Sequence, residues 1–468
     1  MSQPAHDLRD DALRIWQASV EAVDSRRLVL DAVQVSDGRL HIGSQSFELA
    51  RIRRIIVVGA GKAGAGMAEG LEAALGPELL REKQVTGWLN VPADCVRKLA
   101  AIHLHAAREP GQNEPTEAGA VGAAKILRLV GEATTDDLCI ALVSGGGSAL
   151  LPAPAAGITL ADKLAVTRHL SAAGADIRQL NTVRKQLSAI KGGGLRRACH
   201  AGHLVTLIIS DVLGDPLDII ASGPTIDDPA TPADALAVLE QFHAAEAGIG
   251  PAVFDFLRSR RAQGPKPDGC PTTNLIIGNN ATAVDAAARE AQRLGYRTRV
   301  LPTETHEGFA EDVGRRLAAM TVDIQRPSSE VDCLVSGGEP VVQLVPAAAR
   351  GAGGRNQQLV LAAAEVFARE GGERFALVSG GTDGEDGPTD AAGAIVDRAI
   401  LDEAARRGLA IADYLARNDA YHFFEPLKAL IKTGSTHTNV CDIRVVVVDR
   451  GGFLRTELAT EGTEATES

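Results

Sequence analysis

Aromatic residues are scarce in this chain of 468 residues, in which Phe, Trp and Tyr together account for 3%. The core must therefore be built mainly from Leu, Val and Ile and from close contacts of Ala and Gly. Long apolar runs are absent as well. No stretch approaches the roughly 18 continuous apolar residues of a membrane span, and residues 1–9 lack the apolar segment of a signal peptide. We therefore expect a cytoplasmic protein.

Cysteine is also rare, with six residues scattered along the chain and no C-x-x-C pair. This pattern argues against a disulfide framework or a zinc site and is typical of small buried thiols in a reducing compartment. The 60 acidic residues outnumber the 48 basic ones, and no cluster of basic residues interrupts the excess. Nucleic acid and anionic membranes are therefore disfavoured as partners. We expect a small-molecule substrate and a monomer or a homodimer.

Short apolar runs that alternate with helical patterns dominate the first half of the chain. They predict buried strands at 54–58, 85–91, 138–143 and 204–210. This alternation is typical of an α/β fold with a mostly parallel, doubly wound sheet that helices cover on both faces. Ligands bind such sheets beyond the carboxyl ends of the strands, so the loops that follow these strands are the first place to look for a site.

A segment rich in Gly, Pro and charge at 248–273 marks the boundary of a second unit. We expect an N-terminal domain over 1–262, a C-terminal α/β domain over 270–455 and a disordered tail at 456–468. The second domain should begin with a strand at 274–277. Its further strands are predicted at 298–301, 333–335, 341–344, 375–378 and 444–448. The cleft between the two domains is the expected site.

The sequence Val-Ser-Gly-Gly occurs three times, at 143–146, 335–338 and 378–381, each time after an apolar run. A Ser followed by two glycines can present backbone N–H groups at a strand end, which is how proteins cradle anionic oxygens. The first copy reads Ser144, Gly145, Gly146, Gly147, Ser148 and resembles a phosphate-binding loop. The other two end in Glu339 and Asp383, which suggests polar or metal contacts. A tight turn between strand and helix is the alternative for each.

The segment GAGKAG at 59–64 follows a predicted strand and contains Gly59, Gly61 and Lys62. It matches the G-x-G-x-x-G pattern of dinucleotide-binding folds, but the next strand ends near Asn90 without the acidic residue that holds a ribose. No Ser or Thr follows the lysine, so the segment is not a Walker A loop. A lysine at a helix N-terminus suits the negative charge of a transferring phosphoryl group, and a solvated surface lysine is the alternative.

Two charged side chains follow predicted strands in positions suited to chemistry. Asp211 comes directly after a buried strand, where a carboxylate is costly unless it binds a metal or accepts a proton. Arg355 opens a predicted helix and offers a planar fork for a carboxylate or phosphate, unless it only caps neighbouring carbonyls. The loop at 383–390 holds four carboxylates, Asp383, Glu385, Asp386 and Asp390. Such oxygen ligands suit Mg²⁺, and a solvated acidic turn is the competing interpretation.

Lys191 and the loop at 434–440 are two further candidates for ligand contact. Lys191 lies at the end of a predicted helix at 181–190 and could reach a phosphate, although surface lysines are common near helix C-termini. The hydroxyl-rich loop at 434–440 could contact substrate through Asn439 or simply form a turn. His437 in that loop has no Ser or Cys partner arranged as a triad, so nucleophilic hydrolysis has little support.

Taken in order, these motifs resemble the glycerate 2-kinase family, in its animal-type form with a C-terminal MOFRL domain. The segments that carry the resemblance are GAGKAG, LVSGGGSALL, LNTVRKQLSAIKGGGL, SDVLGDPLDIIASGPT, IIGNN, SGGEP, GGRNQ, SGGTDGEDGPTDAAG and TGSTHTN, and the resemblance as a whole covers roughly 12–448. The resemblance implies ATP-dependent phosphorylation of D-glycerate at its 2-hydroxyl with Mg²⁺. It also implies a Rossmann-like N-terminal domain, with the active site in the cleft that it forms with the MOFRL domain.

The matching positions imply that Lys62, Asp211 and Arg355 are the catalytic set. In our interpretation Asp211 accepts or orients the hydroxyl proton, Lys62 neutralises the phosphoryl group, and Arg355 binds the glycerate carboxylate or that same phosphoryl group. Substrate contacts are predicted at Lys62, Arg355, Glu339 and Asn439, and metal contacts at Asp211, Asp383 and Asp386. Nucleotide contacts are predicted at Gly59, Gly61, Ser144, Gly145, Gly146, Gly147, Ser148, Lys191, Asn279, Ser379, Gly380, Gly381 and Thr382.

One stretch departs from the family pattern. Many bacterial relatives carry H-P-x-P-D after the second strand, whereas this chain reads AREPGQNEP over 107–115. Two other functions stay open. An NAD(P)-dependent hydroxypyruvate reductase is favoured only by the segment at 59–64. A non-catalytic sensor of a sugar acid or nucleotide would use the same glycine-rich loops without needing Asp211.

Overall fold

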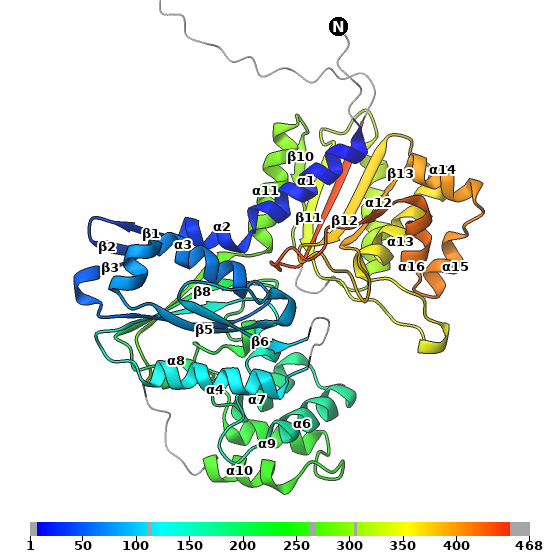
Figure 1. The fold of residues 1–468 in the computed structure, drawn as a ribbon. Coiled ribbons are helices and arrows are strands. Elements are labelled where there is room, and N and C mark those ends of the chain that lie inside the picture. The colour runs from blue at the N-terminus through cyan, green and yellow to red at the C-terminus, as the bar shows by residue number, and fades with distance from the viewer. Residues whose placement is uncertain (1–6, 110–113, 262–267, 304–306, 450–468) are drawn as a thin grey trace, which may run out of the picture.

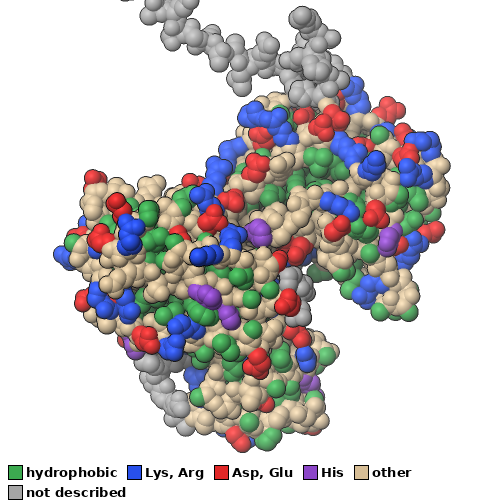
Figure 2. Space-filling view, in the orientation of Figure 1, with side chains coloured by type: hydrophobic (Ala, Val, Ile, Leu, Met, Phe, Trp, Pro, Cys, Tyr) green, Lys and Arg blue, Asp and Glu red, His purple; other side chains and the backbone are tan. Residues whose placement is uncertain are grey.

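A computed structural model describes residues 7–109, 114–261, 268–303 and 307–449, and the tail predicted at 456–468 lies outside them. Two six-stranded sheets lie side by side, each covered by helices (Figure 1). Among the described residues, no helix is both long and apolar enough to cross a membrane. Acidic and basic side chains are interspersed over the face shown in Figure 2, on both lobes of the molecule.

The first sheet is entirely parallel and has the order β6-β5-β4-β7-β8-β9. Its strands are β4 (Ile55–Ala60), β5 (Thr86–Pro92), β6 (Ile102–Arg108), β7 (Leu138–Val143), β8 (His203–Ile209) and β9 (Thr272–Gly278). Numbered along the chain within this sheet, the order is 3-2-1-4-5-6, which is the Rossmann order. The direction of winding reverses between β4 and β7, so a crevice opens there at the carboxyl ends of the strands.

Helices and a small hairpin sheet complete the first lobe. The helices beside the parallel sheet are α2 (Ser25–Ala32), α3 (Gly64–Glu82), α4 (Glu117–Gly131), α5 (Gly147–Leu150) and α8 (Gly194–Ala198), and the hairpin sheet comprises β1 (Val33–Ser36), β2 (Arg39–Ile42) and β3 (Gln45–Glu48). Below them in Figure 1 lies a helical cluster with its own apolar core. It contains α6 (Leu160–Ala172), α7 (Ile177–Gln186), α9 (Pro232–Gln241) and α10 (Pro251–Arg261).

The second sheet is mixed and has the order β10-β11-β15-β12-β13-β14. Its strands are β10 (Thr298–Val300), β11 (Cys333–Gly338), β12 (Phe375–Gly381), β13 (Gly393–Asp397), β14 (Leu430–Ile431) and β15 (Asp442–Val448). Helices α1 (Leu8–Ala22) and α11 (Asn280–Arg293) pack together against it, and α12 (Ala310–Ile324) and α13 (Arg355–Glu370) form a second pair. The shorter helices α14 (Arg398–Arg406), α15 (Ile411–Ala416) and α16 (Ala420–Phe424) lie at the far end.

Sheet membership differs from the prediction at both ends of the N-terminal domain. The strand expected to open the second unit at 274–277 is part of β9, which pairs with β8 and completes the first sheet. Helix α1 packs on the second sheet instead of the first, and the Trp16 indole N–H donates to the Gly380 carbonyl at 3.2 Å. The proposed domain limits of 1–262 and 270–455 therefore do not match the two sheets, because α1 packs on the second sheet and β9 belongs to the first.

Two local predictions are wrong because they depend on which segments pair within the sheet. The expected strand at 341–344 does not form, and only Val341 makes an isolated bridge, to Phe309. Conversely, the Ser-Gly-Gly segments at 336–338 and 379–381 are not loops. They extend β11 and β12 and pair with β15 through residue 442. The backbone N–H and C=O groups of these segments are paired with the neighbouring strand β15, and the sequence pattern alone does not show this pairing.

Candidate active site

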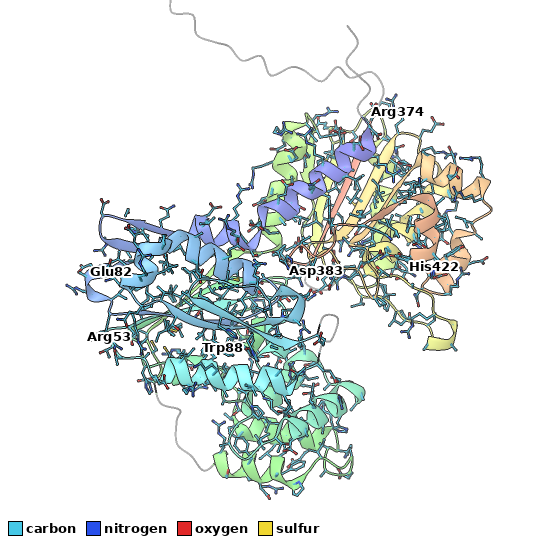
Figure 3. The ribbon with its side chains drawn as sticks, viewed as in Figure 1. Arg53, Glu82, Trp88, Arg374, Asp383 and His422 are labelled. Carbon is cyan, nitrogen blue, oxygen red and sulfur yellow. The ribbon has the colours of Figure 1, made fainter. Side chains whose placement is uncertain are left out.

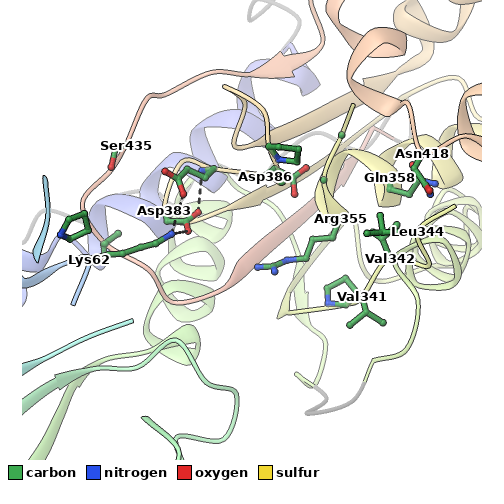
Figure 4. Close-up of a pocket in the computed structure, with 18 of the residues that line it drawn as sticks. Lys62, Val341, Val342, Leu344, Arg355, Gln358, Asp383, Asp386, Asn418 and Ser435 are labelled. Carbon is green, nitrogen blue, oxygen red and sulfur yellow. Dashed lines mark hydrogen bonds and ion pairs between the residues drawn. The ribbon is translucent and has the colours of Figure 1, made fainter. Parts of the chain in front are cut away.

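A cavity of about 800 Å³ lies between the two sheets, and residues from both lobes line it (Figure 4). The first lobe contributes Lys62, Cys95 and Arg108, and the second contributes Arg355 and Asp383 among others. Figure 3 places Asp383 at the junction of the lobes, far from labelled peripheral residues such as Arg374. A cavity with charged walls therefore lies where the site is expected, between the two domains.

The loops after β4 and β7 are bonded to each other at the reversal point of the first sheet. The Ala63 N–H donates to Ser144 Oγ at 3.1 Å, and the Lys62 N–H donates to the Gly145 carbonyl at 2.8 Å. Gly61 has a φ of +151°, and a Cβ built on it would lie 1.9 Å from Ser144 Oγ. The glycines at 59–64 thus allow a close approach of two loops, and this approach fixes where Lys62 leaves the backbone.

Gly61→Ala should therefore destabilise the protein, by about 1–3 kcal/mol for an overpacked site. The control is Gly131→Ala, at the end of α4, where a Cβ would meet only the Ala198 carbonyl oxygen at 3.8 Å. That change should alter the free energy of unfolding by no more than about 0.5 kcal/mol. Urea denaturation measures both. Equal stabilities of the two variants would contradict this account of the loop contact.

Lys62 reaches across the cavity to the acidic loop of the second lobe. Its Nζ lies 3.1 Å from Asp383 Oδ2 and 3.1 Å from Glu385 Oε2 (Figure 4). Burial acts to lower the pKa of Lys62, but these two carboxylates outweigh it and the net pKa is raised. The ammonium group is therefore charged at neutral pH and connects the two lobes at the cavity.

Asp211 follows β8 and faces the loop after β7. A Cβ on Gly145 would lie 2.4 Å from its Oδ2, and the Gly146 backbone N–H donates to its carboxylate. Burial raises the pKa of Asp211, while its backbone hydrogen bonds and the nearby Lys62 act in the opposite sense. A buried carboxylate with a raised pKa beside a lysine has the environment of a general base.

Arg355 begins α13, as predicted, and its guanidinium is held by two carboxylates. Nε and Nη2 donate to the two oxygens of Asp442 at 2.7 and 3.0 Å, and Nη1 lies 3.1 Å from Glu339 Oε1. Asp442 has no exposed surface, whereas the Arg355 side chain is 35% exposed and lines the cavity. Sequence reasoning missed Asp442, because a carboxylate at the start of a strand gives no motif.

Asp386 does not face the cavity as a free carboxylate. Its oxygens accept from the Asn356 and Gln357 N–H groups, at 3.0 and 2.9 Å, so it holds the N-terminus of α13. Burial raises its pKa to about 7, against those two hydrogen bonds. The three carboxylates predicted to bind a metal therefore lie in two places. Asp383 and Asp211 lie near Lys62, whereas Asp386 supports the helix that carries Arg355.

The raised pKa of Asp386 predicts a dependence of stability on pH. The unfolded chain releases this proton near pH 4, whereas the folded chain retains it until about pH 7, so the folded state binds more protons in between. The free energy of unfolding of the wild type, relative to Asp386→Asn, should therefore fall as pH rises from about 4 to about 7. Urea titrations of both proteins at several pH values test this, and a constant difference would contradict it.

The carboxylates at the cavity suit a magnesium ion that binds together with substrate phosphates. They are less suited to a metal ion held by the protein alone. Across the described stretches 7–109, 114–261, 268–303 and 307–449, no group of three His, Cys, Asp or Glu side chains is arranged to hold a metal. Asp383 and Glu385 nevertheless present carboxylates at the cavity beside Lys62. Mg²⁺ is commonly bound by one or two carboxylates together with waters and substrate phosphates.

Several residues predicted to contact a nucleotide have hydrogen-bond partners within the protein. Ser379 Oγ donates to Asn356 Oδ1 at 2.6 Å, and Thr382 Oγ1 donates to the Cys441 carbonyl at 2.7 Å, both fully buried. Gly380 and Gly381 pair within the second sheet. Asn279 caps α11 and donates to Asp215 at 2.5 Å. These side chains are positioned by the fold and do not line the cavity.

Lys191 and Asn439 do not line the cavity either. Lys191 is buried, and its Nζ donates to the Ser148 carbonyl at 2.8 Å and to Ser222 Oγ at 3.2 Å. Burial, followed by nearby cationic side chains, lowers its pKa. Through the bond to the Ser148 carbonyl, Lys191 holds the Ser144–Ser148 loop in place. The Asn439 side chain accepts from the Cys441 N–H at 3.1 Å, which forms a local turn.

These features define a two-domain α/β enzyme whose site lies between a Rossmann-type sheet and a mixed sheet. Two family models match the chain: a domain of unknown function, DUF4147, over residues 11–258, and the MOFRL family over 332–442. The chain is 34% identical to a glycerate kinase from Danio rerio, covering 94% of this chain and 98% of that one. It is 35% identical to a glycerate 2-kinase from Pyrococcus horikoshii, covering 95% and 98%.

A crystal structure of a glycerate kinase from Thermotoga maritima superimposes with a TM-score of 0.80 at 32% identity, covering 94% of this chain and 99% of that one. A chain from Agrobacterium vitis named as a putative hydroxypyruvate reductase is 38% identical, over 84% of this chain and 99% of the relative. This chain belongs to the glycerate 2-kinase family. The resemblance drawn from the ordered motifs is confirmed, as is the two-domain α/β fold.

Proposed function

We propose that this protein transfers the terminal phosphoryl group of ATP, bound with Mg²⁺, to the 2-hydroxyl of D-glycerate. The observation that carries the proposal is the meeting of Lys62, Asp211 and the Ser144–Ser148 loop at the reversal point of the first sheet, across a cavity from Arg355. Phosphoryl transfer needs positioning and charge stabilisation more than a covalent nucleophile. Lys62 and Arg355 supply cations at the cavity wall, and the base Asp211 and the backbone amides of the Ser144–Ser148 loop lie beside Lys62.

Each side chain has a role that follows from its surroundings. Asp211 accepts the proton of the attacking hydroxyl, because burial raises its pKa and so makes it a stronger base than an ordinary aspartate. Lys62 neutralises the transferring phosphoryl group, for which it exchanges its contacts with Asp383 and Glu385. Those two carboxylates would hold Mg²⁺, which when bound supplies charge neutralisation to the phosphates.

Arg355 binds the carboxylate of glycerate. Two of its nitrogens are fixed by Asp442, so the plane of the guanidinium is set before the substrate arrives. The contact with Glu339, whose side chain is 44% exposed, is the one that a substrate carboxylate can replace. Pre-set geometry of this kind lowers the entropy cost of holding the substrate for in-line transfer.

The hydroxypyruvate reductase remains the second candidate, and it rests on the glycines at 59–64 and on the name of one relative. The geometry of the second strand disfavours it. Asn90, which stands where a dinucleotide fold places its ribose-binding acid, is fully buried and donates to the Gly119 and Leu150 carbonyls at 3.0 and 2.7 Å. A cytoplasmic location and a monomeric or homodimeric state stay predictions.

One experiment separates the candidate functions. Purified protein is supplied with Mg-ATP and D-glycerate, ADP release is followed, and the product is read by phosphorus NMR, with NADH and hydroxypyruvate in a parallel well. Glycerate-dependent ADP with 2-phosphoglycerate as product supports the proposal. A 3-phosphate would reject the regiochemistry, NADH consumption would favour the reductase, and turnover in neither well would favour a binding protein.

A further inference from the structure

Arg108 is a cation of the cavity to which the proposed mechanism gives no role. It is the last residue of β6, at the start of the stretch that departs from the family pattern, and it lines the cavity with Lys62. Only 6% of its surface is exposed. Arg108 therefore places a buried positive charge at the wall of the cavity, where it can meet an anion bound there.

Arg108 approaches the backbone of Gly146, which also lies beside Lys62 and Asp211. A Cβ built on Gly146 would lie 3.1 Å from Arg108 Nη2 and 3.6 Å from Lys62 Cγ. The Gly146 N–H donates to the Asp211 carboxylate, and its φ of +76° is a conformation that favours glycine. Arg108 and Lys62 therefore lie beside the same position of Gly146, where no side chain separates them, and Asp211 accepts the N–H of the same residue.

The electrostatics around Arg108 are suited to an anion. Burial lowers its pKa, and Glu385 and Asp94 on the cavity wall act in the opposite sense. Both acids are exposed residues, so solvent screens their effect on the buried guanidinium. A phosphoryl group beside Gly146 would place negative charge next to the buried guanidinium of Arg108, where a charge–charge contact is stronger than in water.

We propose that Arg108 is a further catalytic residue, whose guanidinium contacts the phosphoryl group during transfer from the side of Gly146. The inference rests on the proposed kinase function. In the step, the 2-hydroxyl oxygen of glycerate bonds to the terminal phosphorus of ATP as the bond from that phosphorus to the bridging oxygen breaks. The hydroxyl proton passes to Asp211, and ADP leaves with the electron pair of the broken bond. Arg108 and Lys62 remain protonated and share the charge of the three peripheral oxygens.

The test compares Arg108→Gln, Arg108→Lys and Arg108→Ala. The control is Arg97→Gln, because Arg97 pairs with Glu69 at 2.8 Å outside the cavity. We expect Arg108→Gln to lower kcat by about 10²- to 10³-fold, as for loss of one transition-state donor, with KM for glycerate and Kd for ADP changed less than threefold. Arg108→Lys should recover part of the loss, and millimolar guanidinium should raise the activity of Arg108→Ala. Arg97→Gln should match the wild type.

Binding of a transition-state mimic gives a readout that needs no turnover. With Mg-ADP, aluminium fluoride and glycerate, Arg108→Gln should lose the tight complex that the wild type forms, while it keeps its affinity for ADP. A kcat within threefold of wild type, or a raised KM for glycerate with kcat preserved, would overturn the assignment to the phosphoryl group. Loss of activity in Arg108→Ala that guanidinium does not restore, with a lowered Tm, would assign Arg108 a structural role. A wild type without kinase activity would instead reject the proposed function itself.

Discussion

Replacing Lys62 by methionine is expected to lower kcat by roughly 10²- to 10³-fold, or about 2.7–4 kcal/mol of transition-state stabilisation. Methionine keeps the length of the side chain and removes the charge that meets Asp383 and Glu385 across the cavity. Steady-state kinetics of ADP release measure the effect. In the proposed mechanism Lys62 meets the phosphoryl group as it transfers, so we expect the loss in kcat to exceed any rise in KM for glycerate.

Lys98→Met is the matched control for this change. Lys98 is exposed on the same lobe and does not line the cavity. Its replacement removes one positive charge from the chain without touching the site, so kcat should stay at the wild-type value. A loss of less than tenfold for Lys62→Met would reject the assignment of Lys62 to the transferring phosphoryl group. An equal loss in both variants would point to a general electrostatic effect.

Replacing Asp211 by asparagine is expected to lower kcat by about 10²- to 10⁴-fold, the range for loss of a general base. The amide preserves the shape of the side chain but cannot take the hydroxyl proton. The base must be ionised, and burial raises its pKa, so wild-type kcat should rise with pH on an acidic limb that lies above the usual range of an aspartate. This limb should disappear from the residual activity of Asp211→Asn.

Asp31→Asn is the control for Asp211. The Asp31 side chain is 71% exposed and pairs with Arg27 on the surface of α2. That variant should retain the wild-type kcat and the wild-type acidic limb. If Asp211→Asn instead keeps the limb, the group that titrates lies elsewhere, and Asp211 then orients the hydroxyl without taking its proton.

Much of the first lobe could be predicted from local pattern. The apolar run at 138–143 is strand β7 as predicted, and the strand predicted at 85–91 is β5 shifted by one residue. The prediction that Gly61, Lys62 and Ser144 lie at the carboxyl ends of parallel strands is also confirmed. These predictions succeeded because buried parallel strands are continuous apolar segments and the residues after them necessarily gather at one edge of the sheet.

The sequence by itself determined the family, the two α/β lobes and the position of Lys62, Asp211 and Arg355 at element ends, since these follow from local order along the chain. Only the tertiary structure decided which side chains meet. Asp442 lies 87 residues from the Arg355 that it binds, and Arg108 meets Gly146 only because β6 and β7 belong to one sheet. Contacts of this kind depend on how whole segments pack against each other, and the local sequence pattern does not specify that packing.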